Sequence, residues 1–229
     1  MKILAWHFIN NNGRLSRYWH GIRLDTGPIA TPGKLSRISG VPKPCLWGLH
    51  SSRRILDALK YARGSICCRV EVSGTVREEE GKLCSTRRKI LAMMDISTIL
   101  HEFSCDVAEQ ALKMAEVTDA RSWVAIEVKR KWLRGEATDG DLNIARDAAW
   151  AAAGDAAGDA ARAAAGDAAR AAAARAAEAI AWDAAWDAAW GAAGDAAGAA
   201  AARAAAARAT LNDELEQKVL TTMFPTSCA

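Results

Sequence analysis

Hydrophobic and polar residues alternate with a period of two in two short stretches of the first half of the chain, at positions 2–9 and 65–73. Such alternation is typical of a β-strand that buries one of its faces. We therefore predict two strands at these positions. In the second strand, one face is expected to carry Ile66, Cys68, Val70 and Val72.

Between these strands the pattern becomes helical. Ile55, Leu56 and Leu59 fall on one side of a short helix, and Ser51 or Ser52 is placed to cap its first turn. After the second strand, we expect the glycine at position 74 to turn the chain before a charged loop at 77–81. Residues 14–45 hold four of the five prolines, so loops or short edge strands are expected there.

From residue 97 onward, apolar residues recur every three or four positions, which predicts helices over 97–117 and 122–134. In the second of these helices, Trp123, Ile126 and Leu133 mark the expected buried side. Its basic residues are expected on the opposite, solvated side.

Residues 145–210 are almost wholly alanine, broken every fourth or fifth position by Asp, Arg, Gly or Trp. Alanine has the highest helix propensity, so the stretch is predicted to be helical, with Asp139 or Asp141 capping its first helix. A step of four residues advances about 40° around a helix axis, which disfavours a straight coiled-coil seam. We predict two or three helices packed through alanine methyl groups, followed by a last amphipathic helix at 211–222.

Three tryptophans recur at intervals of four in this stretch, at Trp182, Trp186 and Trp190. We interpret this row as core anchors on one helix face. The alternative is an exposed row through which copies of the chain associate into a homo-oligomer.

Together these elements predict the α+β fold class. A small mixed α/β head is expected at 1–95, a helical connector at 96–144, and an all-α, alanine-rich helical region with its tail at 145–229.

Charge is distributed unevenly along the chain. Residues 1–145 carry 23 basic and 16 acidic side chains, a net charge of +7, whereas the whole chain carries +3. A basic head is compatible with an acidic protein or a nucleic acid as partner. Charged residues recur throughout the alanine-rich stretch, so no membrane-spanning segment is expected.

Six cysteines and four histidines show no spacing typical of a metal site. We therefore expect free thiols in a reducing cytoplasm, with no metal and no cofactor. The chain begins without the long apolar core of a signal peptide, which also favours a cytoplasmic location.

Two basic runs are candidates for an interaction surface, and each is more simply explained as a solvated face. They consist of Arg87, Arg88 and Lys89 in the head, and of Lys129, Arg130 and Lys131 in the connector. Neither run has aromatic residues between its basic ones, so nucleic-acid binding ranks behind the other hypotheses.

Several motifs at 43–95 resemble the N-terminal domain of phage and prophage proteins that join this head to alanine-rich repeats. They include Gly48-Leu49-His50-Ser51 and Leu59-Lys60-Tyr61-Ala62. Residues 105–150 are similar to alanine-rich immunity proteins, on Cys105-Asp106-Val107-Ala108-Glu109 and Trp132-Leu133-Arg134-Gly135-Glu136. The first resemblance implies a mobile-element origin, and the second implies a helical bundle that binds a protein.

A third resemblance is to the front half of ADP-ribosyltransferase-like folds. It implies a ligand pocket formed by His7, His50, Ser51 and Tyr61, in which histidine and aromatic side chains hold a nicotinamide dinucleotide. Position 50 is histidine where that family has tyrosine, and no glutamate follows in a late strand. A structural role for the two histidines is the simpler interpretation.

Three functional hypotheses follow from the sequence. The first is a non-enzymatic phage or mobile-element protein that acts by protein–protein interaction, as an inhibitor of a host defence complex. The second is an ADP-ribosyltransferase-like enzyme or dinucleotide-binding module. The third is a nucleic-acid-binding protein.

Overall fold

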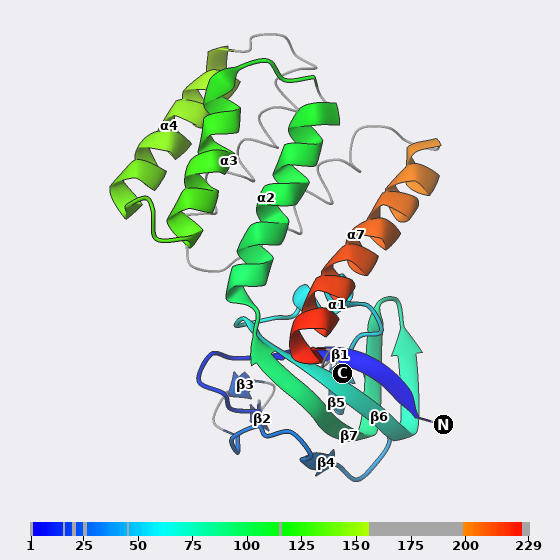
Figure 1. The fold of residues 1–229 in the computed structure, drawn as a ribbon. Coiled ribbons are helices and arrows are strands. Elements are labelled where there is room, and N and C mark those ends of the chain that lie inside the picture. Colours follow the sequence, from blue (N-terminus) through cyan, green and yellow to red (C-terminus); the bar gives the residue numbers. More distant parts are fainter. Residues whose placement is uncertain are drawn as a thin grey trace. The chain divides into compact units, whose positions relative to one another are not determined.

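The structure is a computed structural model that describes residues 2–15, 17–19, 22–24, 27–44, 46–114, 116–155 and 199–225. The fold is α+β, with an antiparallel sheet and separate helices (Figure 1). The chain divides into two compact units. Unit 1 combines residues 1–96 with 212–229, and unit 2 spans 97–211. The C-terminal tail, which we grouped with the alanine-rich region, therefore belongs with the head.

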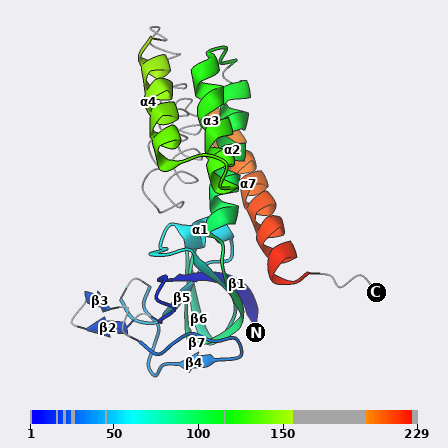
Figure 2. The ribbon, with the colours of Figure 1, turned by 60° about the vertical axis from the view of Figure 1, so that its left-hand side comes forward.

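The core of unit 1 is an antiparallel sheet in the order β1–β6–β7–β4, in which β5 also pairs with β7. Its strands are β1 (Ile3–Ile9), β4 (Leu35–Arg37), β5 (Leu49–Ser51), β6 (Ile66–Glu79) and β7 (Lys82–Asp95). A separate hairpin joins β2 (Arg17–Trp19) to β3 (Ile22–Leu24). Trp6 of β1 and Ser52, next to β5, exchange both backbone hydrogen bonds, at 2.7 and 2.9 Å. The sheet therefore closes on itself, as the curled strands in Figure 2 show.

The two faces of this sheet follow the alternation of the sequence. Ala5 of β1 lies opposite Val70 of β6, which lies opposite Ile90 of β7, and all three are buried in one apolar cluster. We call this side the inner face. The prediction that Ile66, Cys68, Val70 and Val72 share a face is confirmed, because all four belong to this cluster or pack against it.

The prediction that the chain turns at Gly74 is wrong. Gly74 does not end the strand. It lies in a bulge of β6, with a φ of +77° that favours glycine, and β6 continues to Glu79. The predicted charged loop is thus mostly strand, and the turn to β7 lies at residues 80 and 81. Short-range polarity suggested a loop, but pairing with β7 satisfies the backbone of these residues.

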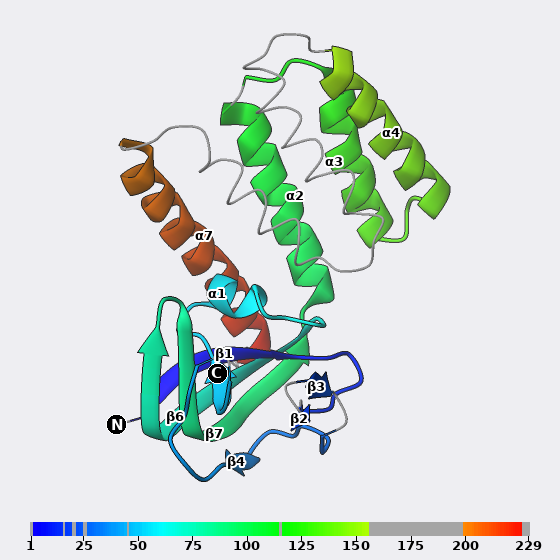
Figure 3. The ribbon, with the colours of Figure 1, turned by 180° about the vertical axis from the view of Figure 1, so that it is seen from behind.

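Helix α1 (Ile55–Leu59) packs against β1, as Figure 3 shows from behind. Neither Ser51 nor Ser52 caps it, because both lie in the paired segment at β5. The acceptors come instead from the distant tail. The side chains of Asn212 and Glu216 each accept a hydrogen bond from an N–H group in the first turn of α1, at 3.0 Å.

Unit 2 contains the helices α2 (Ser97–Met114), α3 (Ala120–Leu133) and α4 (Asp139–Asp155). Helix α7 (Ala199–Met223) begins in unit 2 and ends in unit 1. Ala125 of α3 and Ala145 and Ala149 of α4 form a buried cluster. Alanine methyl groups therefore do form core at the start of the alanine-rich stretch. Residues 199–210 of that stretch lie in α7, whereas residues 156–198, including Trp182, Trp186 and Trp190, lie outside the described residues.

Neighbouring side chains cap the N-termini of α3 and α4. Asp119 accepts a hydrogen bond from the backbone N–H of Arg121 at 2.8 Å and begins α3. At the start of α4, the hydroxyl of Thr138 accepts from the N–H of Asp141, whose carboxylate accepts in return from the N–H of Thr138. Asp141 thus contributes to the cap as predicted, but from the third position of the helix.

In the part of the chain that the structure describes, no helix combines the length and the apolar character needed to cross a membrane. The cysteines described there, Cys67, Cys68, Cys84 and Cys105, are buried and form no disulfide with one another. Among the same residues, no cluster of His, Cys, Asp and Glu side chains is arranged to hold a metal.

Candidate functional site

The short edge strand β4 carries positive charge beside β7. Arg37 lies directly opposite Arg87, and Leu35 lies opposite Lys89. All four side chains are exposed. Like charges directly opposite each other in a sheet repel, so the strand pair itself gains no stability from Arg37 and Arg87. A negatively charged partner would relieve this repulsion.

A compact loop follows β4 and presents apolar side chains. Lys43 and Trp47 exchange backbone hydrogen bonds of 2.6 and 2.8 Å, which closes the loop. The indole N–H of Trp47 donates to the carbonyl of Ser39 at 3.0 Å, and the thiol of Cys84 donates to the carbonyl of Trp47 at 3.2 Å. Trp47 remains 48 % exposed and Leu46 71 % exposed. The loop is thus tied to the sheet, yet its largest side chains face solvent.

Gly48 lets this loop approach β7 closely. Its φ is +146°, and a methyl group at this position would lie 2.0 Å from the sulfur of Cys84. Only glycine fits both the backbone conformation and the space, so Gly48 fixes where Trp47 stands.

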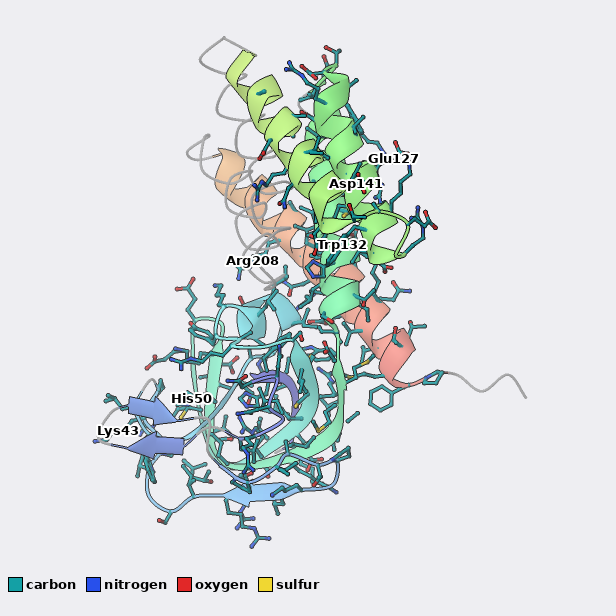
Figure 4. All side chains as sticks on the ribbon, turned by 90° about the vertical axis from the view of Figure 1, so that its left-hand side faces the viewer. Lys43, His50, Glu127, Trp132, Asp141 and Arg208 are labelled. Carbon is teal, nitrogen blue, oxygen red and sulfur yellow. The ribbon has the colours of Figure 1, made fainter. Side chains whose placement is uncertain are left out.

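We call the exposed side chains of this region the Trp47 surface. It consists of Leu35, Arg37, Val41, Lys43, Leu46, Trp47, Arg87 and Lys89. No acidic residue occurs between positions 26 and 56. The surface therefore combines exposed apolar side chains with positive charge. Figure 4 labels Lys43 in this part of the head.

The basic run of β7 splits between two environments. Arg87 and Lys89 point to solvent, whereas Arg88 is buried and donates a hydrogen bond of 2.5 Å to the carbonyl of His50. Arg88 lies opposite Val72 on the inner face. Burial raises the pKa of the nearby Cys68 thiol to about 11, although the charge of Arg88 opposes that shift. Arg88 is thus a structural residue, and its two neighbours are the candidates for binding.

The residues of the proposed dinucleotide pocket do not converge. Trp6 and Ser52 are directly paired and share a face, so His7 and Ser51, one position away on each strand, share the opposite face. His50, two positions from Ser52, then lies on the same face as Trp6. The two imidazoles that the resemblance places around one ligand therefore lie on opposite faces of the sheet.

The other two members of that set differ in burial, with Ser51 buried and Tyr61 exposed. The hydroxyl of Ser51 is buried and has no hydrogen-bond partner among the described residues. Tyr61 is exposed, and the ammonium of Lys82 lies 4.1 Å from the centre of its ring. A pocket lined by all four side chains is not formed.

The basic run of α3 is used within unit 2. Arg130 pairs with two acidic residues of α2, Asp106 at 2.9 Å and Glu109 at 2.7 Å. Lys131 pairs with Glu127 of its own helix at 2.7 Å. These pairs leave the run with little positive charge to offer a nucleic acid.

The expectation that Lys129 lies on the solvated side of α3 is wrong. Lys129 is only 2 % exposed, and its ammonium lies 3.8 Å from the centre of the ring of Trp132. Figure 4 labels Trp132. The face of an indole attracts a cation, which explains how a lysine can occupy a buried helix position. Trp132 is held in place by a 2.7 Å hydrogen bond from its indole N–H to Asp139 and by an edge contact with His101.

Burial dominates the titration of this cluster. It lowers the pKa of Lys129 to about 8, against the opposing influence of Cys105 and Asp139. Burial also lowers the pKa of His101 to about 4, and the charge of Lys129 adds to that shift. Burial thus shifts both groups toward their neutral forms, but a pKa of about 8 leaves Lys129 mostly protonated at pH 7.

This cluster predicts a pH dependence for unit 2. Between the folded pKa of Lys129, about 8, and its ordinary value of 10.5, the unfolded chain binds more protons than the folded chain. The free energy of unfolding should therefore rise with pH across this window. Substitution Lys129→Met should remove that rise and stabilise the protein at neutral pH. Urea unfolding followed by far-ultraviolet circular dichroism, compared between wild type and variant at each pH, measures the difference.

Cysteines and tyrosines titrate in the same pH range. The informative quantity is therefore the difference between wild type and Lys129→Met in how the free energy of unfolding changes with pH. The variant Lys131→Met, which changes a partly exposed lysine two positions away, is the matched control. Equal pH slopes for wild type and Lys129→Met would contradict the prediction.

Sequence reasoning missed the Trp47 surface because it looked for consecutive basic residues. The surface is assembled from β4 and the loop that follows it, and from β7, which comes much later in the sequence. One signal was available: the long stretch without acidic residues between positions 26 and 56, which contains Trp47.

Comparison with known proteins locates this surface within a family match. Residues 31–102 match the model of a family described as a domain of unknown function, DUF7666. The match covers 72 of the 229 residues and runs from β4 to the start of α2, so it contains the whole Trp47 surface. Neither the curated proteins nor the solved structures give a match.

Proposed function

We propose that this chain acts without catalysis, by binding a protein partner through the Trp47 surface of its head. The observation that carries this proposal is the anchored loop after β4, which holds Leu46 and Trp47 in solvent. The indole of Trp47 is bonded to the carbonyl of Ser39, two residues after Arg37. Because the sheet already holds this loop in one conformation, the loop loses little conformational entropy when it binds a partner.

The composition of the surface indicates the chemistry of the partner. Tryptophan and arginine are the residue types most enriched at binding hot spots, and apolar anchors surrounded by charge are typical of protein interfaces. Several of the exposed anchors are aliphatic, which favours a protein pocket over nucleotide bases. The basic rim calls for an acidic partner, which would also be attracted at long range.

A host defence complex is the first class of partner to test. The resemblance of the head to phage and prophage proteins supports this choice. An inhibitor that covers an acidic functional surface of its target needs no catalytic residues. Under this proposal, function does not require His7 and His50 to lie in one pocket.

A photo-crosslinking amino acid at position 46 tests the proposal in host cells. Ile144, in unit 2, is the matched control position because it is also 71 % exposed. We expect a protein adduct from position 46 and none from position 144. The adduct should disappear when Arg37→Glu is added, because the rim charge is then reversed.

Once the adduct identifies the partner, binding can be measured with purified proteins. Leu46→Asp should weaken binding at least about tenfold, as expected for loss of a hot spot, while Ile144→Asp should leave it unchanged. Equal adducts at both positions, or an adduct insensitive to Arg37→Glu, would contradict the proposal.

A nucleic-acid partner is the alternative outcome of the same experiment. An exposed indole beside arginines also suits a stacked base next to a phosphate. In that case the crosslinked species would be sensitive to nuclease, and binding would fall steeply as salt is raised. That result would replace the protein partner with a single-stranded nucleic acid.

A further inference from the structure

Strand β4 forms an open edge of the sheet in unit 1. It pairs with β7 on one side, and no described strand pairs with its other side. In Figure 1, β4 lies at the lower edge of the head. The opposite end of the sheet, at β1, is closed by the bridge from Trp6 to Ser52. An open edge leaves backbone N–H and C=O groups available to a further strand.

The hydrogen bonds between β4 and β7 show which backbone groups face the open side. The carbonyl of Lys34 accepts a bond from β7 at 3.0 Å, and the N–H of Ile38 donates a bond to β7 at 3.0 Å. The N–H and the C=O of one peptide group point in opposite directions. The N–H of Leu35 and the C=O of Arg37 therefore point away from β7. Among the described residues, neither group has a hydrogen-bond partner.

Trp47 lies close to this open row of backbone groups. Ser39, two positions after Arg37, accepts the hydrogen bond from the indole N–H of Trp47 at 3.0 Å. A strand added beside β4 that continues past Arg37 would therefore reach the indole. The open edge thus leads to the apolar part of the Trp47 surface.

The side chains along the edge indicate what an added strand would carry. Leu35 and Arg37 are exposed on one face of β4, and their neighbours on β7 are Lys89 and Arg87. Side chains of a strand alternate between its two faces, so every second one of an added strand would lie beside this positive charge. Acidic residues at alternate positions match it. A second copy of β4 would instead bring another basic strand against Arg37, which disfavours pairing between copies.

We propose that the partner supplies an extended acidic segment, which adds to β4 as a further strand and contacts Trp47 at its end. This inference rests on the proposed function, since it uses the Trp47 surface. In this mode of recognition, main-chain hydrogen bonds give affinity and alternate side chains give specificity. Because β4 has only three residues, its backbone offers few bonds, and charge contributes much of the affinity.

Synthetic peptides test whether binding uses one edge of an extended chain. The probe is a capped peptide in which glutamate and threonine alternate. One variant is N-methylated at every glutamate amide and another at every threonine amide, so charge and side chains stay the same while each variant keeps the N–H groups of one edge. One variant should bind the wild-type protein at least about tenfold more weakly than the probe, and the other about as well as the probe. Equal affinities for the two variants would overturn strand addition, and so would a probe that does not bind.

Hydrogen exchange, followed by NMR on isotope-labelled protein, locates the new bonds. The amide of Leu35 should become protected when the probe is added, because it would donate to the added strand. The amide of Ile38 is the internal control, since it already donates to β7 and should change little. Binding of the probe without protection at Leu35 would contradict the inference.

A proline at the open edge tests the same bond from the side of the protein. Leu35→Pro removes the outward N–H but none of the bonds to β7, and proline is accepted on open edges. Leu35→Ala is the matched control, because it removes the side chain and keeps the N–H. Leu35→Pro should bind the probe at least about tenfold more weakly than Leu35→Ala, and equal affinities would overturn the inference. If urea unfolding shows that the proline destabilises the head, the methylated peptides with the wild-type protein decide.

The crosslink from position 46 separates this inference from the proposed function. An adduct that is lost with Leu35→Pro but kept with Leu35→Ala supports both. An adduct that survives Leu35→Pro would show that the partner uses the Trp47 surface without adding a strand, so the inference fails and the proposed function stands. If no adduct forms, the proposed function fails, whereas the peptide measurements still decide whether β4 accepts an acidic strand.

Discussion

Substitution Gly48→Ala is expected to destabilise the head by about 2–6 kcal/mol and to abolish partner binding. The positive φ of Gly48 costs a residue with a side chain about 1–3 kcal/mol. The added methyl group would also lie 2.0 Å from the Cys84 sulfur, and overpacking of this kind costs roughly 1–3 kcal/mol. Chemical denaturation, followed by hydrogen exchange in peptides from β6 and β7, measures the loss in the head alone.

Two further variants separate the causes. Gly33→Ala also places a side chain at positive φ, +83°, but no atom lies within 4 Å of the new methyl group, so only the conformational part of the cost should appear. Combining Gly48→Ala with Cys84→Ala removes the clashing sulfur and should recover part of the stability. If Gly48→Ala proved no worse than Gly33→Ala, close packing of the loop on β7 would not be what positions Trp47.

Substitution Arg88→Ala is expected to cost about 2–4 kcal/mol, although Arg87→Ala should change stability by less than about 0.5 kcal/mol. The first removes a buried side chain and leaves the carbonyl of His50 without the hydrogen bond that Arg88 donates, and a buried polar group that loses its partner costs roughly 1–3 kcal/mol. The cavity left behind adds to this loss. The second removes only an exposed side chain.

Binding should show the opposite order. Arg87→Ala is expected to weaken the partner complex and to reduce its dependence on salt, because Arg87 belongs to the Trp47 surface. Arg88→Met, which keeps most of the buried volume without the charge, should be better tolerated than Arg88→Ala and should bind normally. The hypothesis of a structural Arg88 fails if Arg88→Ala proves as stable as Arg87→Ala.

The alternation of side chains predicted the strand at 65–73 and its buried face, because burial of one face imposes a period of two on the sequence. It could not predict the bulge at Gly74 or the extension of β6. Those depend on where β7 pairs, and pairing is decided between segments. A polar run such as Glu78 and Glu79 is compatible with either a loop or an exposed edge.

The missed cap of α1 has the same origin. Ser51 and Ser52 have the right chemistry and position to begin a helix, but the bridge from Ser52 to Trp6 engages the backbone there. The groups that do cap α1 lie about 160 residues away in sequence, at Asn212 and Glu216. Local patterns contain no information about contacts of this range.

Lys129 shows a different limit. Its residue type assigned it to solvent because lysine is rarely buried, although its spacing from Ala125 and Ile126 places it on the buried side of α3. An indole ring within the same helix offsets the cost of burying the lysine. The Trp47 surface shows the converse case. Its residues were each visible in the sequence, but the strand pairing that gathers them was not.

The docking of residues 212–223 of α7 on the head determines when the first turn of α1 gains its acceptors during biosynthesis. The head's strands leave the ribosome early, yet the acceptors for the first turn of α1 are translated only after the whole alanine-rich stretch. At usual elongation rates of about 5–20 residues per second, the nascent head waits several seconds for them. A message truncated before codon 212 would therefore release a head in which the first turn of α1 lacks both side-chain acceptors.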